Sequence, residues 1–220
     1  MEIRVMENIF DENDRTADEL RAMFREKNVF VINLLGSPGS GKTSLLEKTL
    51  GVLSKKFSIA VIEGDLFTAR DAERIDRLNV PVVQINTAGG CHLDAPMIKS
   101  ALDSIDLDAL DVLIIENVGN LVCPASFDLG ENIRAVMLSI TEGDDKPLKY
   151  PIIFKDAAIV LLNKIDLLEH TNFDLNSARS DLQSINPTVE IIETSCTSER
   201  GLEQWSGWLE NKILSGSEKV

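Results

Sequence analysis

Short apolar runs alternate along the chain with amphipathic stretches, and this alternation predicts the fold. Six runs rich in Val and Ile are expected to be strands, over residues 29–35, 58–64, 80–86, 111–117, 157–163 and 189–195. Several are apolar on both faces, as strands buried in a parallel sheet are. The segments between them have helical patterns, over residues 43–54, 69–78, 95–103, 175–185 and 201–213. Strands and helices in this order predict an α/β protein with a doubly wound, mostly parallel sheet flanked by helices.

The first part of the chain falls outside this alternation. Leu20, Met23 and Phe24 form one amphipathic stripe in "TADELRAMFREK", which predicts an N-terminal helix packed on the sheet. Neither repeats nor an inter-domain linker interrupt the rest. We therefore expect a helical extension over residues 1–27, followed by one domain over 28–220.

The stretch over residues 121–155 also departs from the pattern. It is long and mixed, with "ENIRAVMLSI" followed by the polar, Pro-containing "TEGDDKPLKYP". A connection of this length inside a compact domain is usually functional or an extra hairpin.

The first predicted strand runs directly into a phosphate-binding motif. "GSPGSGKT" matches G-x-x-x-x-G-K-[ST], with a strand before it and a helix after it, as this P-loop requires. The glycines let backbone N–H groups point at phosphate oxygens, Lys42 reaches the β/γ-phosphates, and the Thr43 hydroxyl ligates Mg²⁺. The predicted phosphate-binding residues are Gly36, Ser37, Pro38, Gly39, Ser40, Gly41, Lys42, Thr43 and Ser44.

A second motif bears on the base of the nucleotide. "NKID" stands at the end of the fifth predicted strand and resembles the N-K-x-D signature of GTPases, which makes Asn163, Lys164 and Asp166 candidate base contacts. A carboxylate at Asp166 accepts two hydrogen bonds from guanine, whereas adenine offers no such pair. Ser195 and Cys196, in the loop after the last strand, are expected to contact guanine as well. GTP is therefore favoured over ATP.

Acidic residues end two strands near the expected phosphates. Asp65 in "VIEGD" and Glu116 in "IIENVG" are candidate Mg²⁺ groups, and the N–H of Gly119 is a candidate γ-phosphate contact. Together with Lys42 and Thr43, the two carboxylates form the predicted catalytic set. The chain has no glutamine near Gly119 to orient an attacking water, so we expect slow intrinsic hydrolysis.

Three cysteines and two histidines are spread over the chain, yet Cys91 and His92 are adjacent. Cys123 follows Gly119 by four residues, and the loops after the third and fourth strands are candidates to be neighbours. Two thiolates and one imidazole suit Ni²⁺ or Zn²⁺ rather than Mg²⁺ or Ca²⁺. The alternative is that these cysteines are small buried apolar residues, as we expect for Cys196.

Composition and charge exclude several classes of function. The net charge is −14, which disfavours nucleic acids and anionic membranes as partners. No apolar run has the roughly 20 residues of a membrane span, and the acidic start does not resemble a signal peptide. Three cysteines argue against a disulfide framework, so we expect a reducing, cytoplasmic location.

Several motifs taken together resemble one family. "GSPGSGKT", "EGD", "GGCHLD", "ENVGNLVCP", "TEGDDKPLKYP" and "NKIDL" are similar to those of the HypB family of hydrogenase nickel-incorporation GTPases, which are SIMIBI-class P-loop proteins. The resemblance covers residues 28–213, and the pair "GGCHLD" and "ENVGNLVCP" is its most specific part. It implies a homodimer, dependent on nucleotide, that helps to deliver Ni²⁺ into [NiFe]-hydrogenase. Other hydrogenase maturation proteins and the hydrogenase large subunit precursor are the implied partners.

The resemblance also implies roles for individual residues. Cys91, His92 and Cys123 match the nickel or zinc site of the family, near the dimer interface. The nucleotide site matches at residues 36–43 and at Asp65, Glu116, Asn163 and Asp166. A lysine of "KPLK" is implied to reach the nucleotide across the dimer, and we favour Lys149 over Lys146.

One departure and three alternatives remain. Residues 1–27 contain neither Cys nor His, so the nickel-binding N-terminal motif of many bacterial members is not found there. Metal handling would then fall on the site in the GTPase domain. The alternatives are an accessory GTPase for urease or another metalloenzyme, a GTP switch whose Cys and His are structural, and an ATP-dependent kinase.

Overall fold

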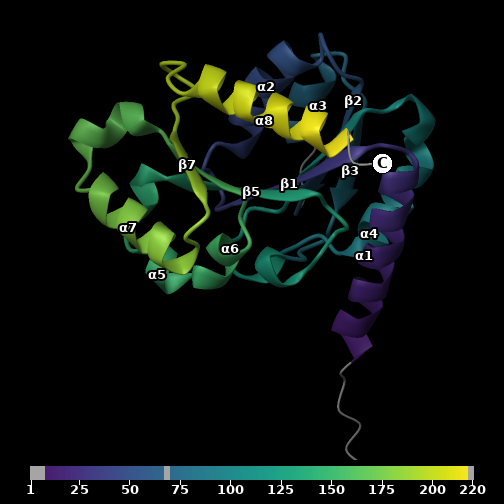
Figure 1. Ribbon diagram of the computed structural model, residues 1–220, viewed down its shortest axis with the longest axis horizontal. Coiled ribbons are helices and arrows are strands. Elements are labelled where there is room, and N and C mark those ends of the chain that lie inside the picture. Colours follow the sequence, from purple (N-terminus) through teal and green to yellow (C-terminus); the bar gives the residue numbers. More distant parts are fainter. Residues whose placement is uncertain (1–7, 67–69, 218–220) are drawn as a thin grey trace, which may run out of the picture.

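The structure is a computed structural model that describes residues 8–66 and 70–217. Within these residues, the centre of the molecule is a seven-stranded sheet in the order β3-β2-β4-β1-β5-β6-β7 (Figure 1). Every neighbouring pair of strands is parallel. The strands are β1 (Phe30–Gly36), β2 (Ile59–Asp65), β3 (Val82–Asn86), β4 (Val112–Glu116), β5 (Ile133–Ser139), β6 (Ile159–Asn163) and β7 (Glu190–Glu193). The predicted α/β fold with a parallel sheet is confirmed.

Helices cover both faces of this sheet (Figure 1). The α-helices are α1 (Asn8–Glu26), α2 (Lys42–Leu53), α3 (Arg70–Asp76), α4 (Ala95–Ala101), α5 (Lys146–Lys149), α6 (Pro151–Lys155), α7 (Leu175–Ile185) and α8 (Leu202–Ser217). Short 3₁₀ turns are η1 (Leu102–Ser104), η2 (Leu107–Ala109), η3 (Cys123–Ser126), η4 (Ile140–Glu142) and η5 (Ile165–His170). No helix in the described ranges is long and apolar enough to cross a bilayer.

The alternating side chains of β1 explain the two layers. Ile32 and Leu34 pack in the core cluster beneath α2 and α8, whereas Val31 and Leu35 point to the opposite face. Because both faces are covered by helices, β1 is buried along its whole length. This is why a nearly continuous apolar run marks the strand in the sequence.

The region 121–155 contains a strand that the sequence pattern did not predict. β5 pairs in parallel with both β1 and β6, so it lies near the middle of the sheet. Of the two alternatives for this region, the extra hairpin is wrong, because β5 is parallel to both of its neighbours. The strand begins with Ile133 and the charged Arg134 after a polar loop, so the buried run of Ala135–Leu138 is too short to stand out in the sequence.

The predicted N-terminal helix is present as α1, which packs against α4 and the sheet. Leu20 and Phe24 are buried in the same core cluster as strand residues of β1, β2 and β4. Asn13 also attaches α1 to its neighbours, since its Oδ1 accepts from the N–H of Ala95 at 2.9 Å and its Nδ2 donates to the carbonyl of Asp128 at 3.0 Å. α1 is therefore part of the layer that covers one face of the sheet.

Candidate nucleotide and metal sites

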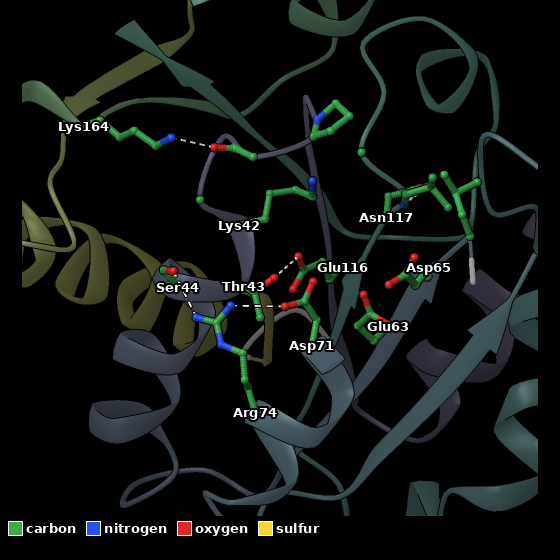
Figure 2. A pocket seen from close by; sticks show the side chains of 17 residues that line it. Lys42, Thr43, Ser44, Glu63, Asp65, Asp71, Arg74, Glu116, Asn117 and Lys164 are labelled. Atoms are coloured by element: carbon green, nitrogen blue, oxygen red, sulfur yellow. Dashed lines mark hydrogen bonds and ion pairs between the residues drawn. The ribbon is translucent and has the colours of Figure 1, made fainter. Parts of the chain in front are cut away.

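A cleft of about 430 Å³ opens at the carboxyl ends of β1, β2 and β4 (Figure 2). This is the edge of a parallel sheet at which ligands bind in open α/β folds. Its lining residues are Pro38, Gly39, Gly41, Lys42, Thr43, Ser44, Glu63, Gly64, Asp65, Leu66, Asp71, Arg74, Glu116, Asn117, Val118, Gly119 and Lys164. The cleft thus holds most of the predicted phosphate and Mg²⁺ residues, and it adds several that were not predicted.

The P-loop connects β1 to α2 and curls around Lys42. Gly41 has φ +105°, and a Cβ there would lie 2.5 Å from Nδ2 of Asn163, so both the backbone conformation and the space require glycine. No side chain caps the first turn of α2. Its N–H groups therefore remain available to a phosphate, at the positive end of the helix dipole.

Lys42 is a nearly buried cation at the bottom of the cleft. Its Nζ lies 3.4 Å from the carbonyl of Gly36 and 3.3 Å from that of Ser37. Burial lowers the pKa of Lys42, and the charge of nearby Glu116 partly opposes that shift. An anionic group in the cleft would compensate this ammonium.

Two buried carboxyl groups stand side by side behind the P-loop. Glu63 on β2 is the register partner of Glu116 on β4, and the Thr43 hydroxyl donates to Oε1 of Glu116 at 2.7 Å (Figure 2). Burial raises the pKa of Glu63 to about 8 and that of Glu116 to about 7. Oε2 of each carboxyl is buried without a hydrogen-bond partner among the described residues. A buried carboxyl oxygen of this kind needs a bound cation or a proton to offset the cost of its burial.

Further carboxylates complete a set of oxygen donors. Glu63, Asp65 and Asp71 each offer an oxygen within 4.8 Å of the others. Hard divalent cations such as Mg²⁺ take oxygen ligands of this kind. The donors present therefore fit the predicted Mg²⁺, and the unpartnered Oε2 atoms of Glu63 and Glu116 could bind such a cation in place of a proton.

Four further residues line this cleft that the sequence pattern did not predict: Glu63, Asp71, Arg74 and Asn117. Glu63 had a usable signal, because it precedes Asp65 by two positions and such residues share one face of a strand. Arg74 had none, since its partners outside its own helix come from α2: it donates to Ser44 Oγ at 3.0 Å and to Glu47 Oε2 at 2.6 Å. The predicted helix start at 69 lies outside the described residues.

The "NKID" segment is attached to the P-loop. Asn163 donates to the carbonyl of Ser40 at 2.8 Å, and Lys164 donates to that of Gly39 at 2.7 Å. Asp166 accepts from the Ser195 hydroxyl at 2.5 Å, which connects it to the loop after β7. The structure therefore brings together the P-loop and the two predicted base-contact segments, although they are far apart in sequence.

Cys196 and Lys149 were also predicted to contact the nucleotide, but neither lines the cleft. Cys196 is half-buried and packs against the core cluster under α8, and this burial raises the pKa of its thiol. Lys149 is exposed on α5, where it pairs with Asp145, and it does not line the cleft of its own chain. Lys146 lies 5.6 Å from the centroid of the Tyr150 ring.

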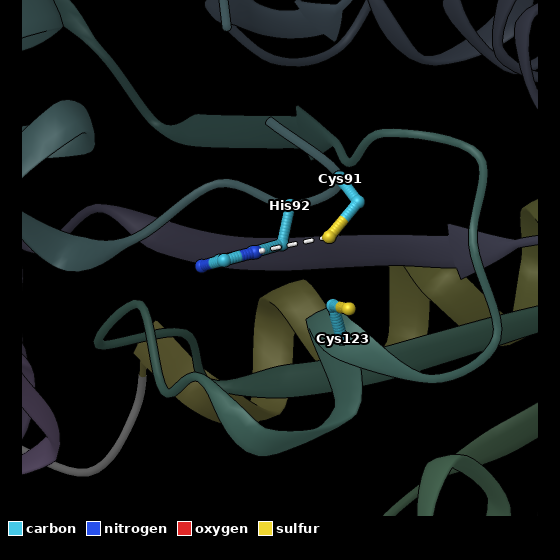
Figure 3. A group of neighbouring side chains, drawn as sticks. All are labelled: Cys91, His92 and Cys123. Carbon is cyan, nitrogen blue, oxygen red and sulfur yellow. Dashed lines mark hydrogen bonds between the residues drawn. The ribbon is translucent and has the colours of Figure 1, made fainter. Parts of the chain in front are cut away.

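Cys91, His92 and Cys123 lie together, with ligand atoms within 4.8 Å of one another (Figure 3). All three are half-buried, and Cys91 Sγ lies 3.7 Å from His92 Nδ1. Hydrogen bonding with Cys123 and burial raise the pKa of Cys91, whereas burial lowers the pKa of His92. A neutral imidazole is the form that binds metal.

Gly64 explains how two loops from separated strands meet. β2 lies between β3 and β4, so the loop carrying Cys91 must cross the end of β2. A Cβ at Gly64 would lie 2.8 Å from Leu93 Cδ1. The missing side chain lets Leu93 pack over β2, and the His92 ring stacks on Phe127, 3.9 Å between centroids, in the loop after η3.

Comparison with known proteins places this fold and these motifs in one family. The model "CobW/HypB/UreG, nucleotide-binding domain" matches residues 30–193. Hydrogenase maturation factor HypB of Escherichia coli (strain K12) is 51% identical over 205 residues, which are 93% of this chain and 71% of that protein. Hydrogenase/urease maturation factor HypB of Helicobacter pylori (strain J99) is 41% identical over 215 residues, 96% of this chain and 88% of that protein.

A solved structure agrees. The crystal structure of HypB from Helicobacter pylori in complex with nickel has a TM-score of 0.89 and 40% sequence identity, and the match covers 95% of this chain and 98% of that one. The resemblance found in the motifs is thus confirmed over most of the chain. The chain belongs to the HypB family and carries the nucleotide-binding domain that the CobW, HypB and UreG proteins share.

Proposed function

We propose that this protein is a GTP-hydrolysing metallochaperone that binds nickel and assists its insertion into [NiFe]-hydrogenase. One observation carries the proposal, and it concerns the segment from Glu116 to Cys123. This segment lines the nucleotide cleft at one end, and at the other it supplies a thiol to the group Cys91, His92 and Cys123, called the thiol cluster below. Other maturation proteins and the hydrogenase large subunit precursor are the proposed partners.

The nucleotide side of the proposal rests on charge and hydrogen bonding. Lys42 and the open N–H groups of α2 would hold the phosphates, and Gly119 would contact the γ-phosphate. Thr43, Asp65 and Glu116 would hold Mg²⁺, which neutralises charge on the β- and γ-phosphate oxygens when bound. Hydrolysis is expected to be slow in the isolated chain.

Selectivity for guanine rests on Asp166. Its carboxylate would accept from the ring N–H and the exocyclic amine of guanine, while the Lys164 stem would lie along the base. Ser195 supports this role, because its hydroxyl already orients Oδ1 of Asp166. Adenine would leave the carboxylate without a partner, which costs about 1–3 kcal/mol or more for a charged group.

The metal side rests on the Cys91, His92 and Cys123 cluster. Two sulfurs and one nitrogen suit nickel, with zinc as a competitor for the same atoms. The related HypB structure from Helicobacter pylori was solved in complex with nickel, which supports nickel as the cargo. Three ligands leave a coordination position for a water, the cargo's recipient or a second chain.

A homodimer that forms with nucleotide is supported by exposed apolar side chains on the successive elements η3, α5 and α6 and next to them. Val122, Leu148 and Ile152 are 57%, 60% and 60% exposed, and α6 packs against η3. Exposed large apolar side chains gathered around a candidate site are typical of interaction surfaces. Lys149 lies between Leu148 and Ile152 in the chain and does not line its own cleft, and we propose that it reaches the nucleotide of a partner chain.

A second candidate function is maturation of urease. The Helicobacter pylori relative is described as a hydrogenase/urease maturation factor, so one member of the family serves both enzymes. Deleting the gene in its native host and assaying both enzymes, with and without added nickel, separates the two functions. Loss of hydrogenase activity alone supports the hydrogenase role.

The test uses purified full-length protein loaded with Ni²⁺ and with GDP or a non-hydrolysable GTP analogue. Cys123→Ala should abolish nickel binding while largely preserving GTP binding, and Cys196→Ser should keep the nickel stoichiometry. Size-exclusion chromatography should show a dimer with the GTP analogue. Unchanged nickel stoichiometry in Cys123→Ala, or a preference for ATP in nucleotide competition, would refute the proposal.

A further inference from the structure

Asn120 lies between the nucleotide cleft and the thiol cluster, and it contacts both. Its backbone N–H donates to the carbonyl of Gly36, the first P-loop residue, at 3.0 Å. Its side-chain Nδ2 donates to the carbonyl of Cys91 at 3.2 Å. Its Oδ1 accepts from the N–H of Val122 at 2.9 Å, which shapes the turn leading into Cys123. One half-buried residue thus binds the P-loop and the segments that carry both thiols.

The residue before Asn120 is tightly packed against the P-loop. A Cβ at Gly119 would lie 2.8 Å from the backbone Cα of Pro38. There is no free space between Gly119 and the Pro38 backbone. A phosphate that displaces either residue should therefore also displace Asn120, which follows Gly119 in the chain. The backbone bond from Asn120 to Gly36 adds a second point of attachment at the same place.

The two thiol-bearing segments are also held by bonds that do not involve Asn120. The Cys91 loop is attached at Leu93, whose N–H donates to Asn117 Oδ1 at 3.1 Å. Cys123 begins η3, whose carbonyl at Ala125 accepts from Arg134 at 3.0 Å. The Leu93–Asn117 bond and the stacking of His92 on Phe127 also join the Cys91 loop to the segment around Cys123, but neither contact includes a P-loop residue. Asn120 bonds to the P-loop and to both thiol-bearing segments.

We infer that Asn120 is a positioning residue that sets the placement of Cys91 relative to Cys123 according to the nucleotide bound at the P-loop, and so couples nucleotide state to nickel affinity. This inference rests on the proposed binding of GTP and nickel. Coupling of this kind is reciprocal: nickel must change the preference for GTP over GDP by the same factor. Factors of about 5 to 150 are typical of coupled sites.

Two substitutions distinguish the hydrogen bond from Asn120 to the Cys91 carbonyl from the bond that it accepts from Val122. Asn120→Asp keeps an acceptor for the Val122 N–H but loses the donor to the Cys91 carbonyl. Asn120→Ala loses both, and the backbone bond to Gly36 persists in each. Asn176→Ala, an exposed position on α7, is the matched control. The added charge of Asp shifts nickel affinity in both nucleotide states, so the readout is the ratio of the two affinities.

The experiment measures the dissociation constant for Ni²⁺ by competition with a chromophoric chelator, in GDP and in a non-hydrolysable GTP analogue. Wild type and Asn176→Ala should show a ratio within the range above. Asn120→Asp and Asn120→Ala should bind both ligands with a ratio close to one, and nickel should no longer alter their nucleotide preference. A purely structural turn residue would weaken nickel binding equally in both states and leave the ratio intact.

Each other outcome has a definite meaning. A wild-type ratio in Asn120→Asp overturns the inference, and so does a ratio of one in wild type that binds both ligands. Should Asn120→Ala fail to fold, Asn120→Asp still decides, because it retains the turn. Wild type that binds no nickel or no GTP refutes the proposed function itself, which is a different result.

Discussion

Glu63 allows a quantitative test of the electrostatics of the cleft. Its side chain is 3% exposed, its Oε2 has no hydrogen-bond partner among the described residues, and its neighbour across the sheet is the second buried carboxyl, Glu116. Burial, followed by the charge of Glu116, raises the pKa of Glu63 from 4.5 to about 8. Replacement by Gln keeps the shape of the side chain and removes its ability to ionise.

The sign of the effect follows from the number of protons bound. Between the unfolded pKa of 4.5 and the folded pKa of about 8, the native protein retains a proton at Glu63 that the unfolded chain releases. The free energy of unfolding therefore falls as pH rises, by about 1.4 kcal/mol per pH unit well below the folded pKa. Between pH 6 and pH 8 the loss amounts to about 2 kcal/mol. Glu63→Gln lacks this loss, so its stability relative to wild type should grow by that amount.

The assay is urea unfolding of nucleotide-free protein in excess chelator, at pH 6, 7 and 8. Chelation matters because a bound cation would compensate the carboxylates and mask the effect. Glu203→Gln, at an exposed position on α8, is the control, and its difference in free energy of unfolding from wild type should be the same at all three pH values. A difference between Glu63→Gln and wild type that stays constant from pH 6 to pH 8 would refute the reasoning. It would show that the cleft solvates Glu63 despite its low exposure.

Three further substitutions test separate parts of the structure. Asp166→Asn should reduce GTP affinity by about 10- to 100-fold, since it removes a charged acceptor for guanine; an unchanged GTP-to-ATP ratio in competition binding would contradict the base assignment. Gly119→Ala should weaken binding of a GTP analogue more than that of GDP, because its Cβ would lie 2.8 Å from the Pro38 backbone, beside the proposed γ-phosphate position. Equal weakening of the two nucleotides in titration calorimetry would argue against this. Asn186→Ala should lower the free energy of unfolding by about 1–3 kcal/mol, because the carbonyls of Phe154 and Ala157 lose their buried donor. Urea unfolding at pH 7 measures this change. A change under about 0.5 kcal/mol, the size of a surface effect, would contradict the prediction.

Local sequence was sufficient wherever function depends on contiguous residues. The P-loop could be predicted because the strand, the glycines and the first turn of α2 follow one another, so their geometry is determined by the backbone itself. The "NKID" segment was recognisable for the same reason, and its predicted position at the end of a strand agrees with β6, which ends at Asn163. The alternation of strands and helices likewise predicted the parallel sheet, because strands covered on both faces need apolar residues at successive positions.

β5 is a strand that the hydrophobic pattern did not predict. Its buried positions are apolar, but a polar loop precedes it and Arg134 stands at its second position. Arg134 is paired with Glu131 and with two loop carbonyls, so its charge is compensated by groups that only the folded chain brings near. A charged residue that is satisfied by tertiary contacts looks, in the sequence alone, like a residue of a loop.

The metal site and the nucleotide site were likewise only partly predictable from the sequence. The residue types of the Cys91, His92 and Cys123 cluster predicted a metal chemistry, but their meeting depends on the strand order and on the space that Gly64 leaves for Leu93. The pairing of Glu63 with Glu116 depends on β2 and β4 being neighbours in that order. Sequence by itself determined the chemistry of each segment, because bonding capacity belongs to a residue wherever it lies. Only the tertiary structure decided which segments share a site, because the register of the sheet sets distances between residues that the chain keeps far apart.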